Sequence, residues 1–432
     1  MEQRTMDINS IIKNFATYPL KGDALDEKTG FYVDTIEART GNPFKSPIDN
    51  IFRDCTLEYV NFIHLLLGHR GCGKSTEINK LEVRLKEAGF AVRKIDCQTE
   101  ANLATLKVED ILIFISNALL DICEEKNIDI DPSDVEKLKY YFDTIEKIIT
   151  RKTGKTASGG VGGGINLNLQ VFKLTAEAKG QIMGSSDEIT TVRRNLINYF
   201  DEWNVCIDNI IEKIREKDDQ KYPIIIFENF DKIRETERAI DMFTKGYLDN
   251  IRTPVIYTFP ISLSYSEKFG TIEQYVSSHV FPMIEVNKKT GEKNEAGYEA
   301  IKKIIAKRAS LDFFEEDAVN LLIEKTGGCL RDIFKMTVQA LRYTDRQSKE
   351  RVGVKEVGWA LEDERSLITR RITMKDYPAL NEIYKTKAEI EDKSTMLRLL
   401  EAHVVLEYNG ERWHDLHPLI YDFLKENNRI TE

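Results

Sequence analysis

Mostly apolar runs recur along the first two thirds of the chain, and helical patterns separate them. The runs that predict strands are Phe62–Leu67, Ala91–Cys97, Pro223–Glu228, Pro254–Phe259 and Val280–Val286. Such runs are typical of strands buried on both faces, as in a parallel sheet. In Thr76–Leu85 and Val108–Glu125, apolar residues recur three or four positions apart, which predicts amphipathic helices. Strands alternating with helices predict an α/β core, a parallel sheet in a three-layer arrangement.

Two further segments are predicted from local pattern alone. Phe31–Asp34 resembles a short strand before the core, and Asp131–Ile149 has a helical pattern. Between the second and third strands, at about residues 151–184, the glycine-rich run Ser158–Gly164 precedes alternating apolar and polar residues. This pattern predicts a β insertion with a flexible connection. Because exposed apolar strands pair with other chains, we expect it to contact a neighbouring subunit or a partner; a hairpin folded on its own domain is the alternative.

Helices dominate the chain after the sheet. The pattern is helical from Gly297 to Arg346, with a break at Gly327-Gly328. Near the C-terminus, Asn409-Gly410 lies between two apolar runs, which indicates a hairpin, and a last helix follows through Leu419–Leu424. We therefore predict a core with an N-terminal lead-in at residues 1–290, a helical lid at 291–370 and a C-terminal winged-helix domain at 371–432.

Composition limits the partners and the cellular compartment that we expect for this chain. The formal net charge is -10, which argues against a general polyanion binder. We find no stretch of ~18 uninterrupted apolar residues and no apolar signal-peptide core, so we expect no membrane partner. The six cysteines are scattered singly, without a C-x-x-C pair. Free thiols in a reducing cytoplasm fit this spacing better than a zinc site.

One motif carries most of the chemistry, and it fits the phosphate-binding pattern G-x-x-x-x-G-K-[ST] at every fixed position. Its residues, with the one that follows, are Gly68-His69-Arg70-Gly71-Cys72-Gly73-Lys74-Ser75-Thr76. A predicted strand precedes it and a predicted helix follows, as phosphate binding at a helix N-terminus requires. We expect Lys74 to reach the β- and γ-phosphates of ATP and Ser75 to hold Mg²⁺.

A second signal lies at the end of the third predicted strand, which reads Phe227-Glu228-Asn229-Phe230-Asp231. Glu228 is placed to act on Mg²⁺ with Ser75. Asn229 cannot act as a general base, so Asp231 is the remaining acid that could position the attacking water. The alternative is that Asp231 caps the next helix. ATP binding is therefore better supported than fast hydrolysis.

Two more residues are candidate phosphate contacts. Thr258 lies at the end of the fourth predicted strand, with Ser262 just beyond it, and could sense the γ-phosphate; an ordinary strand-end hydroxyl is the alternative. Arg331 begins a helix just after Gly327-Gly328, where a guanidinium can point at the phosphates; a surface arginine is the alternative.

These residues together resemble a family. The phosphate loop is similar to that of bacterial AAA+/STAND-type P-loop ATPases, which are related to the origin-recognition branch and include antiviral-defence ATPases. The spacing of Glu228 and Asp231 matches the two acids of STAND proteins, although Glu replaces the usual Asp. Gly327–Asp332 resembles the start of a sensor-2 helix, which implies a nucleotide contact for Arg331, and Tyr32–Asp34 resembles the segment near the adenine. The resemblance implies an ATP-driven oligomeric switch with a terminal winged helix. Arg252 and Lys268 are candidates for an arginine finger.

Three functions compete. The first is a slowly hydrolysing ATP switch that forms a homo-oligomer and regulates a partner or effector protein. The second is a DNA-binding initiator or loader that uses the winged helix. Residues 371–432 hold nine Lys/Arg and twelve Asp/Glu, a balance that disfavours DNA, although four basic residues cluster there: Lys385, Lys387, Lys393 and Arg398. The third, a metabolic kinase, does not explain the lid and winged helix.

The pair His414 and His417 fits local packing better than a metal site.

Overall fold

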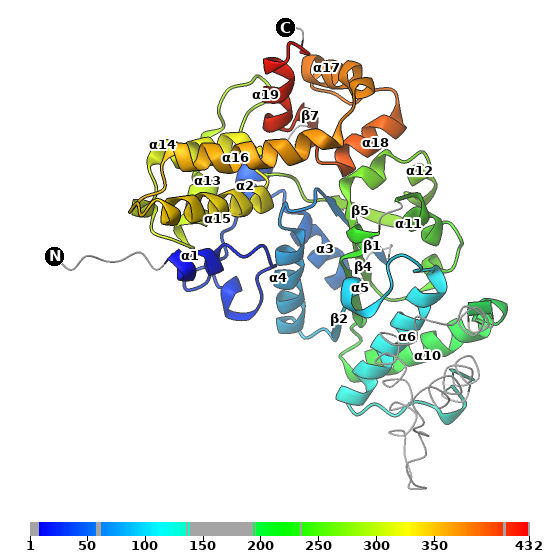
Figure 1. Ribbon diagram of the computed structural model, residues 1–432. Coiled ribbons are helices and arrows are strands. Elements are labelled where there is room, and N and C mark those ends of the chain that lie inside the picture. Colours follow the sequence, from blue (N-terminus) through cyan, green and yellow to red (C-terminus); the bar gives the residue numbers. More distant parts are fainter. Residues whose placement is uncertain are drawn as a thin grey trace, which may run out of the picture.

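The computed structural model describes residues 8–57, 62–134, 137–138, 193–194, 196–233, 236–408 and 412–430. Most of the helix expected at Asp131–Ile149, the β insertion at about 151–184 and the Asn409-Gly410 turn lie outside these residues. They stay predictions, as do the three domain boundaries. Figure 1 shows a central sheet with a helical layer beside it and the C-terminal helices above.

Within the described residues, five parallel strands form the sheet in the order β2-β3-β4-β1-β5. They are β1 (Ile63–Gly68), β2 (Val92–Asp96), β3 (Ile224–Glu228), β4 (Val255–Pro260) and β5 (Val276–Val280). Every residue of the three inner strands is buried, which explains their apolar runs. Because the strands are parallel, the loops after β1 and β3 emerge at the same edge of the sheet.

The position predicted for the fifth strand was wrong. The structure places β5 at Val276–Val280, at the edge of the sheet and only partly buried. An edge strand needs no continuous apolar run. Ser277, Ser278 and His279 interrupt the apolar pattern of β5, so the pattern did not predict a strand there. The apolar residues that follow are buried outside the strand: Phe281, Met283, Ile284 and Val286. The Phe281 N–H donates a hydrogen bond to the Leu67 carbonyl, 2.7 Å away.

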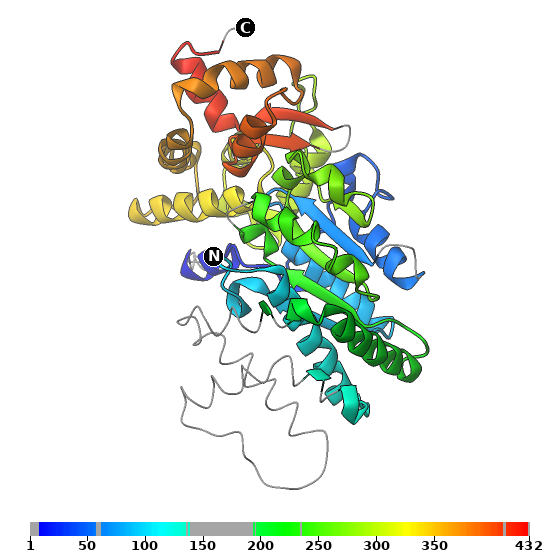
Figure 2. The same cartoon turned by 90° about the vertical axis from the view of Figure 1, so that its right-hand side faces the viewer.

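Helices cover both faces of the sheet (Figure 2). On one face, α3 (Pro47–Thr56) and α4 (Lys74–Glu87) pack against Leu66, Ile226 and Ile256. On the other, α6 (Val108–Glu125) and α10 (Phe200–Lys217) pack against alternate residues of the same strands. The described part of the core also contains the short helices α2 (Ile36–Thr40), α5 (Cys97–Glu100), α11 (Thr236–Phe243) and α12 (Phe269–Ile272).

The lid consists of α13 (Glu295–Ala306), α14 (Glu316–Thr326), α15 (Leu330–Arg346) and α16 (Val354–Ile368). The N-terminal helix α1 (Ile8–Asn14) shares their apolar cluster, and the Phe15 ring lies 5.9 Å from that of Phe334 in α15. The turn before α15 needs its glycines: Gly327 and Gly328 have positive φ, and a Cβ on Gly328 would lie 2.0 Å from the Ile284 carbonyl oxygen.

The C-terminal segment combines three helices with a hairpin, an arrangement compatible with a winged helix. The helices are α17 (Tyr377–Thr386), α18 (Lys393–Glu401) and α19 (Pro418–Glu426); the antiparallel strands are β6 (Val405–Tyr408) and β7 (Trp413–Leu416). Leu406, Tyr408 and Trp413 belong to the apolar cluster that contains α3 and α4. The hairpin therefore packs on the core. None of the described helices is long and apolar enough to cross a membrane.

Candidate nucleotide-binding site

The phosphate loop connects β1 directly to α4. Gly71 and Gly73 have φ values of +88° and +113°, a backbone region that only glycine adopts without strain. No side chain caps the N-terminus of α4. The positive end of that helix dipole is thus presented to a ligand, as anion binding requires.

Lys74, the first residue of α4, turns back over this loop. Its Nζ donates hydrogen bonds to the carbonyls of Gly68 (2.7 Å) and His69 (2.9 Å). It also lies 3.6 Å from Oδ2 of Asp231. The ammonium group is buried but faces the cavity described below, where a phosphate would be its strongest partner.

Glu228 ends β3 and lies beside the Ser75 side chain. Burial raises the pKa of Glu228, and the Ser75 hydroxyl opposes this effect by favouring the carboxylate. The structure thus brings together the two residues predicted to act on Mg²⁺. A hydroxyl beside a carboxylate at the phosphate end of a nucleotide site fits a hard, oxygen-seeking cation.

The two polar residues that follow, Asn229 and Asp231, have different partners. Asn229 adopts a left-handed conformation with φ +63°, and its Nδ2 donates to Oδ1 of Asp96 on the neighbouring strand, 2.7 Å away. Asp231 lies within a 3₁₀ turn whose N-cap is Asn229, so it is not the cap of that turn. Its carboxylate faces Lys74 instead, and its carbonyl accepts a hydrogen bond from Arg70 Nη2 at 2.7 Å.

These groups line a cavity of about 850 Å³, within the usual size of a small-molecule site. Its walls include the lead-in at 17–21 and 31–35, the phosphate loop with the start of α4, residues 96–99 at the end of β2, residues 228–232 at the end of β3, and the lid residues Arg308, Leu330, Arg331 and Phe334. Phe31–Asp34, predicted as a short strand, is irregular instead and pairs with none of the described strands; its residues Phe31, Tyr32 and Val33 line the cavity. There the Tyr32 hydroxyl donates to Glu77 Oε1 at 3.1 Å.

Of the other candidate residues, Arg331 borders the cavity, whereas Thr258, Arg252 and Lys268 do not. The Arg331 side chain borders the cavity, and its backbone N–H donates to the Gly71 carbonyl at 3.2 Å. Thr258 is buried within β4, with its hydroxyl 3.5 Å from the Phe227 carbonyl, and does not line the cavity. Arg252 and Lys268 also lie away from it, and pair with Asp208 and Asp241.

The motif gave no indication of two arginines at the site. Arg39 Nη2 donates to the Cys72 carbonyl at 2.8 Å, and its guanidinium lies 4.3 Å from the centre of the Phe281 ring, so it braces the loop. Arg308 lies 4.5 Å from the Phe334 ring, and burial lowers its pKa to about 10. Its buried Nε has no hydrogen-bond partner in the structure, and the side chain lines the cavity.

His69 points away from the cavity, toward the C-terminal hairpin. Its Nε2 accepts a hydrogen bond from the backbone N–H of Glu407 in β6, at 2.8 Å. The ring also packs edge-on against that of His403. Of the predicted pair, His414 lies 2.6 Å from the Tyr265 hydroxyl, and His417 caps α19. His69 occupies a variable motif position, so the sequence carried no signal for this contact.

No protein-family model matches the chain, and no curated protein matches it. Similar solved structures include the ORC1 protein of Aeropyrum pernix in complex with DNA, at 12% identity and a TM-score of 0.38, over 94% of this chain and 96% of that chain. A Walker-type ATPase of Pyrococcus abyssi has 13% identity and a TM-score of 0.42 over 91% and 99%. Cdc6p from Pyrobaculum aerophilum has 11% identity and a TM-score of 0.38 over 94% and 99%.

The order and pairing of this chain's own elements define its fold. A phosphate loop joins the first strand of an all-parallel sheet to a helix, and a helical lid and a small antiparallel hairpin with helices follow. This is a P-loop α/β fold. The fold class predicted from the sequence is confirmed.

Proposed function

We propose that the chain binds ATP with Mg²⁺ in this cavity, hydrolyses it slowly and works as a switch. The observation that carries the proposal is the convergence of Lys74, Ser75 and Glu228 at the uncapped N-terminus of α4. Mg²⁺ would supply charge neutralisation at the phosphates. Slow turnover follows from Asn229, whose amide is engaged by Asp96 and cannot accept a proton, which leaves Asp231 as the acid near the phosphate end.

Contacts of the phosphate loop support the switch. Gly71 accepts a hydrogen bond from Arg331 at the start of the lid helix, and His69 accepts one from Glu407 in the C-terminal hairpin. A change in loop geometry on nucleotide binding would therefore alter contacts to both. In the proposed function, this movement controls self-association and a partner or effector protein. The defence role that the resemblance implies stays a prediction.

Replacement of Lys74 tests the site. Lys74→Ala removes charge-assisted contacts to the phosphates, each worth roughly 1.5–3 kcal/mol, so ATP affinity measured by calorimetry should fall at least ~10-fold. The matched control is Lys86→Ala in the same helix, because Lys86 is half exposed and pairs with Glu82. Unchanged ATP affinity in a folded Lys74→Ala protein would disprove the site. Light scattering with and without ATP then tests self-association.

DNA binding is the alternative, and charge pairing argues against it. Three of the four clustered basic side chains have carboxylate partners: Lys387 with Asp415, Lys393 with Glu389, and Arg398 with Asp376. The hairpin also buries its apolar side chains on the core. Fluorescence anisotropy with duplex DNA at ~150 mM salt separates the two functions, since specific binding there would favour the initiator-like alternative.

A further inference from the structure

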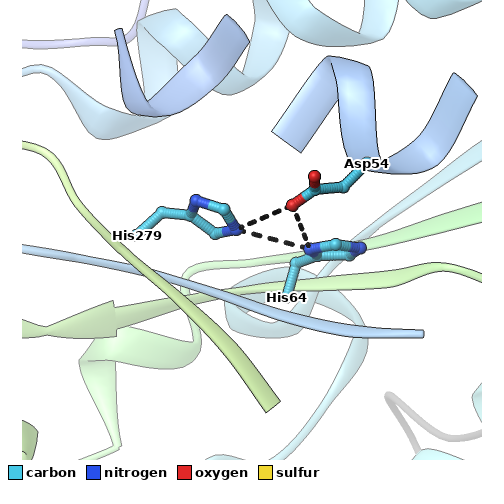
Figure 3. A group of neighbouring side chains, drawn as sticks. All are labelled: Asp54, His64 and His279. Atoms are coloured by element: carbon cyan, nitrogen blue, oxygen red, sulfur yellow. Dashed lines mark hydrogen bonds and ion pairs between the residues drawn. The ribbon is translucent and has the colours of Figure 1, made fainter. Parts of the chain in front are cut away.

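Three side chains from separate elements meet on the α3 face of the sheet, away from the nucleotide cavity. Asp54 comes from α3, His64 from β1 and His279 from β5, and Figure 3 shows all three pointing toward one another. His64 Nδ1 lies 3.4 Å from His279 Nε2 and 3.9 Å from Asp54 Oδ2. His279 Nε2 lies 3.7 Å from the same Asp54 oxygen.

These distances suit a shared ion better than direct hydrogen bonds. A hydrogen bond from an imidazole to a carboxylate would bring nitrogen and oxygen to about 2.7–3.2 Å, and both N···O distances are longer. A triangle with sides of 3.4, 3.7 and 3.9 Å has a circumradius of about 2.1 Å, so one point lies at that distance from all three atoms. Zinc binds His nitrogen and carboxylate oxygen at about 2.0–2.2 Å.

The chemistry of the three groups points the same way. His64 Nδ1 and His279 Nε2 both lie beside the Asp54 carboxylate, and imidazole nitrogen and carboxylate oxygen are ligand atoms of zinc. Two imidazoles and a carboxylate suit zinc and other first-row divalent ions. The Asp54 side chain is 34% exposed, whereas that of His64 is 1% exposed. An ion can therefore enter from the α3 side, where a water molecule can complete the coordination.

We propose that Asp54, His64 and His279 form a zinc site. Zinc there would connect α3 to two neighbouring strands, four residues before the phosphate loop begins at Gly68. The cysteine spacing argued against a zinc site with cysteine ligands, and it does not bear on a site made of His and Asp. The competing explanation is a packed histidine pair in which His64 Nδ1 and His279 Nε2 share a proton. The site does not depend on ATP binding, so the proposed function can fail without affecting it.

Metal titration of the full chain tests the proposal. After treatment with a chelator and dialysis, calorimetry should show one equivalent of zinc. Asp54→Asn and His279→Gln should each weaken zinc binding at least ~10-fold, which is the smallest loss expected even for residues that only support metal ligands. The two variants change different elements and include a half-exposed helix residue, and circular dichroism confirms that each is folded.

Two controls locate the ion. Asp49→Asn changes another carboxylate of α3, one that pairs with Arg84, and should leave zinc affinity unchanged. Cys329→Ser changes a second cluster, in which ligand atoms of Cys329, Asp332 and His403 lie within 4.8 Å of one another. In the cobalt-substituted protein we expect no thiolate charge-transfer band. The proposal is overturned if the parent binds no zinc, if both site variants bind it like the parent, or if Cys329→Ser abolishes binding.

Discussion

Nε2 of His69 accepts a hydrogen bond from the backbone N–H of Glu407, and this contact joins the phosphate loop to the C-terminal hairpin. Both residues are almost completely buried. The bond is therefore shielded from water, and removal of the acceptor would leave a buried donor without a partner.

The first prediction follows from that donor. His69→Leu should lower the free energy of unfolding by roughly 1–3 kcal/mol, the cost of leaving a buried donor unsatisfied. His69→Gln keeps an acceptor in the side chain and should lose less. Urea denaturation of the three proteins measures the difference. Equal losses in both variants would show that ring packing against His403, rather than the hydrogen bond, matters.

The second prediction concerns pH. Burial, together with the electrostatic influence of the nearby His403, Lys74 and His414 side chains, holds the pKa of His69 well below its usual value. Below pH ~6.5 the unfolded chain binds a proton at this residue that the folded chain does not, so stability is lost as pH falls. His69→Gln should flatten this decline by up to ~1.4 kcal/mol per pH unit. Urea unfolding of both proteins between pH 7.5 and 5.5 measures it; parallel curves would contradict the assignment.

The third prediction uses two glycines with the same φ value. Gly71 and Gly291 both have φ +88°, but a Cβ on Gly71 would lie 2.6 Å from the Cβ of Arg331, whereas nothing lies within 4 Å at Gly291. Both alanine variants should lose roughly 1–2 kcal/mol of stability through backbone strain. Only Gly71→Ala should also weaken ATP binding, because the loop must shift away from the lid. Calorimetry with ATP decides, and equal affinities would refute the close contact.

The fourth prediction concerns turnover. Asp231→Asn should reduce the ATP hydrolysis rate at least ~10-fold while changing ATP affinity less than ~3-fold, because the carboxylate would act mainly in the transition state. Asp241→Asn is the control, since that carboxylate pairs with Lys268 at the surface. Steady-state hydrolysis and equilibrium binding are measured on the same preparations. Matching losses of rate and affinity would instead assign Asp231 to ground-state binding through Lys74.

The sequence predicted those features whose requirements are local. The phosphate loop needs glycines at fixed positions, and the inner strands need apolar side chains on both faces, so both were visible in the pattern. The edge strand β5 was misplaced because one exposed side removes that requirement. The roles of His69 and Arg308 arise only when distant segments meet. Thr258 shows the same limit, since its place in the sequence did not show which way its side chain points.

The packing of the C-terminal hairpin on the core has a consequence for dissecting this chain. Trp413 Nε1 donates to Glu285 at 2.8 Å, and the Tyr408 hydroxyl donates to the Gly327 carbonyl at 2.9 Å, at the turn that leads into the lid helix. A fragment that stops before the hairpin would expose the apolar surface that these rings cover and would free that turn. The C-terminal hairpin is thus part of the folding unit, and a fragment without it is a poor substitute for the chain described here.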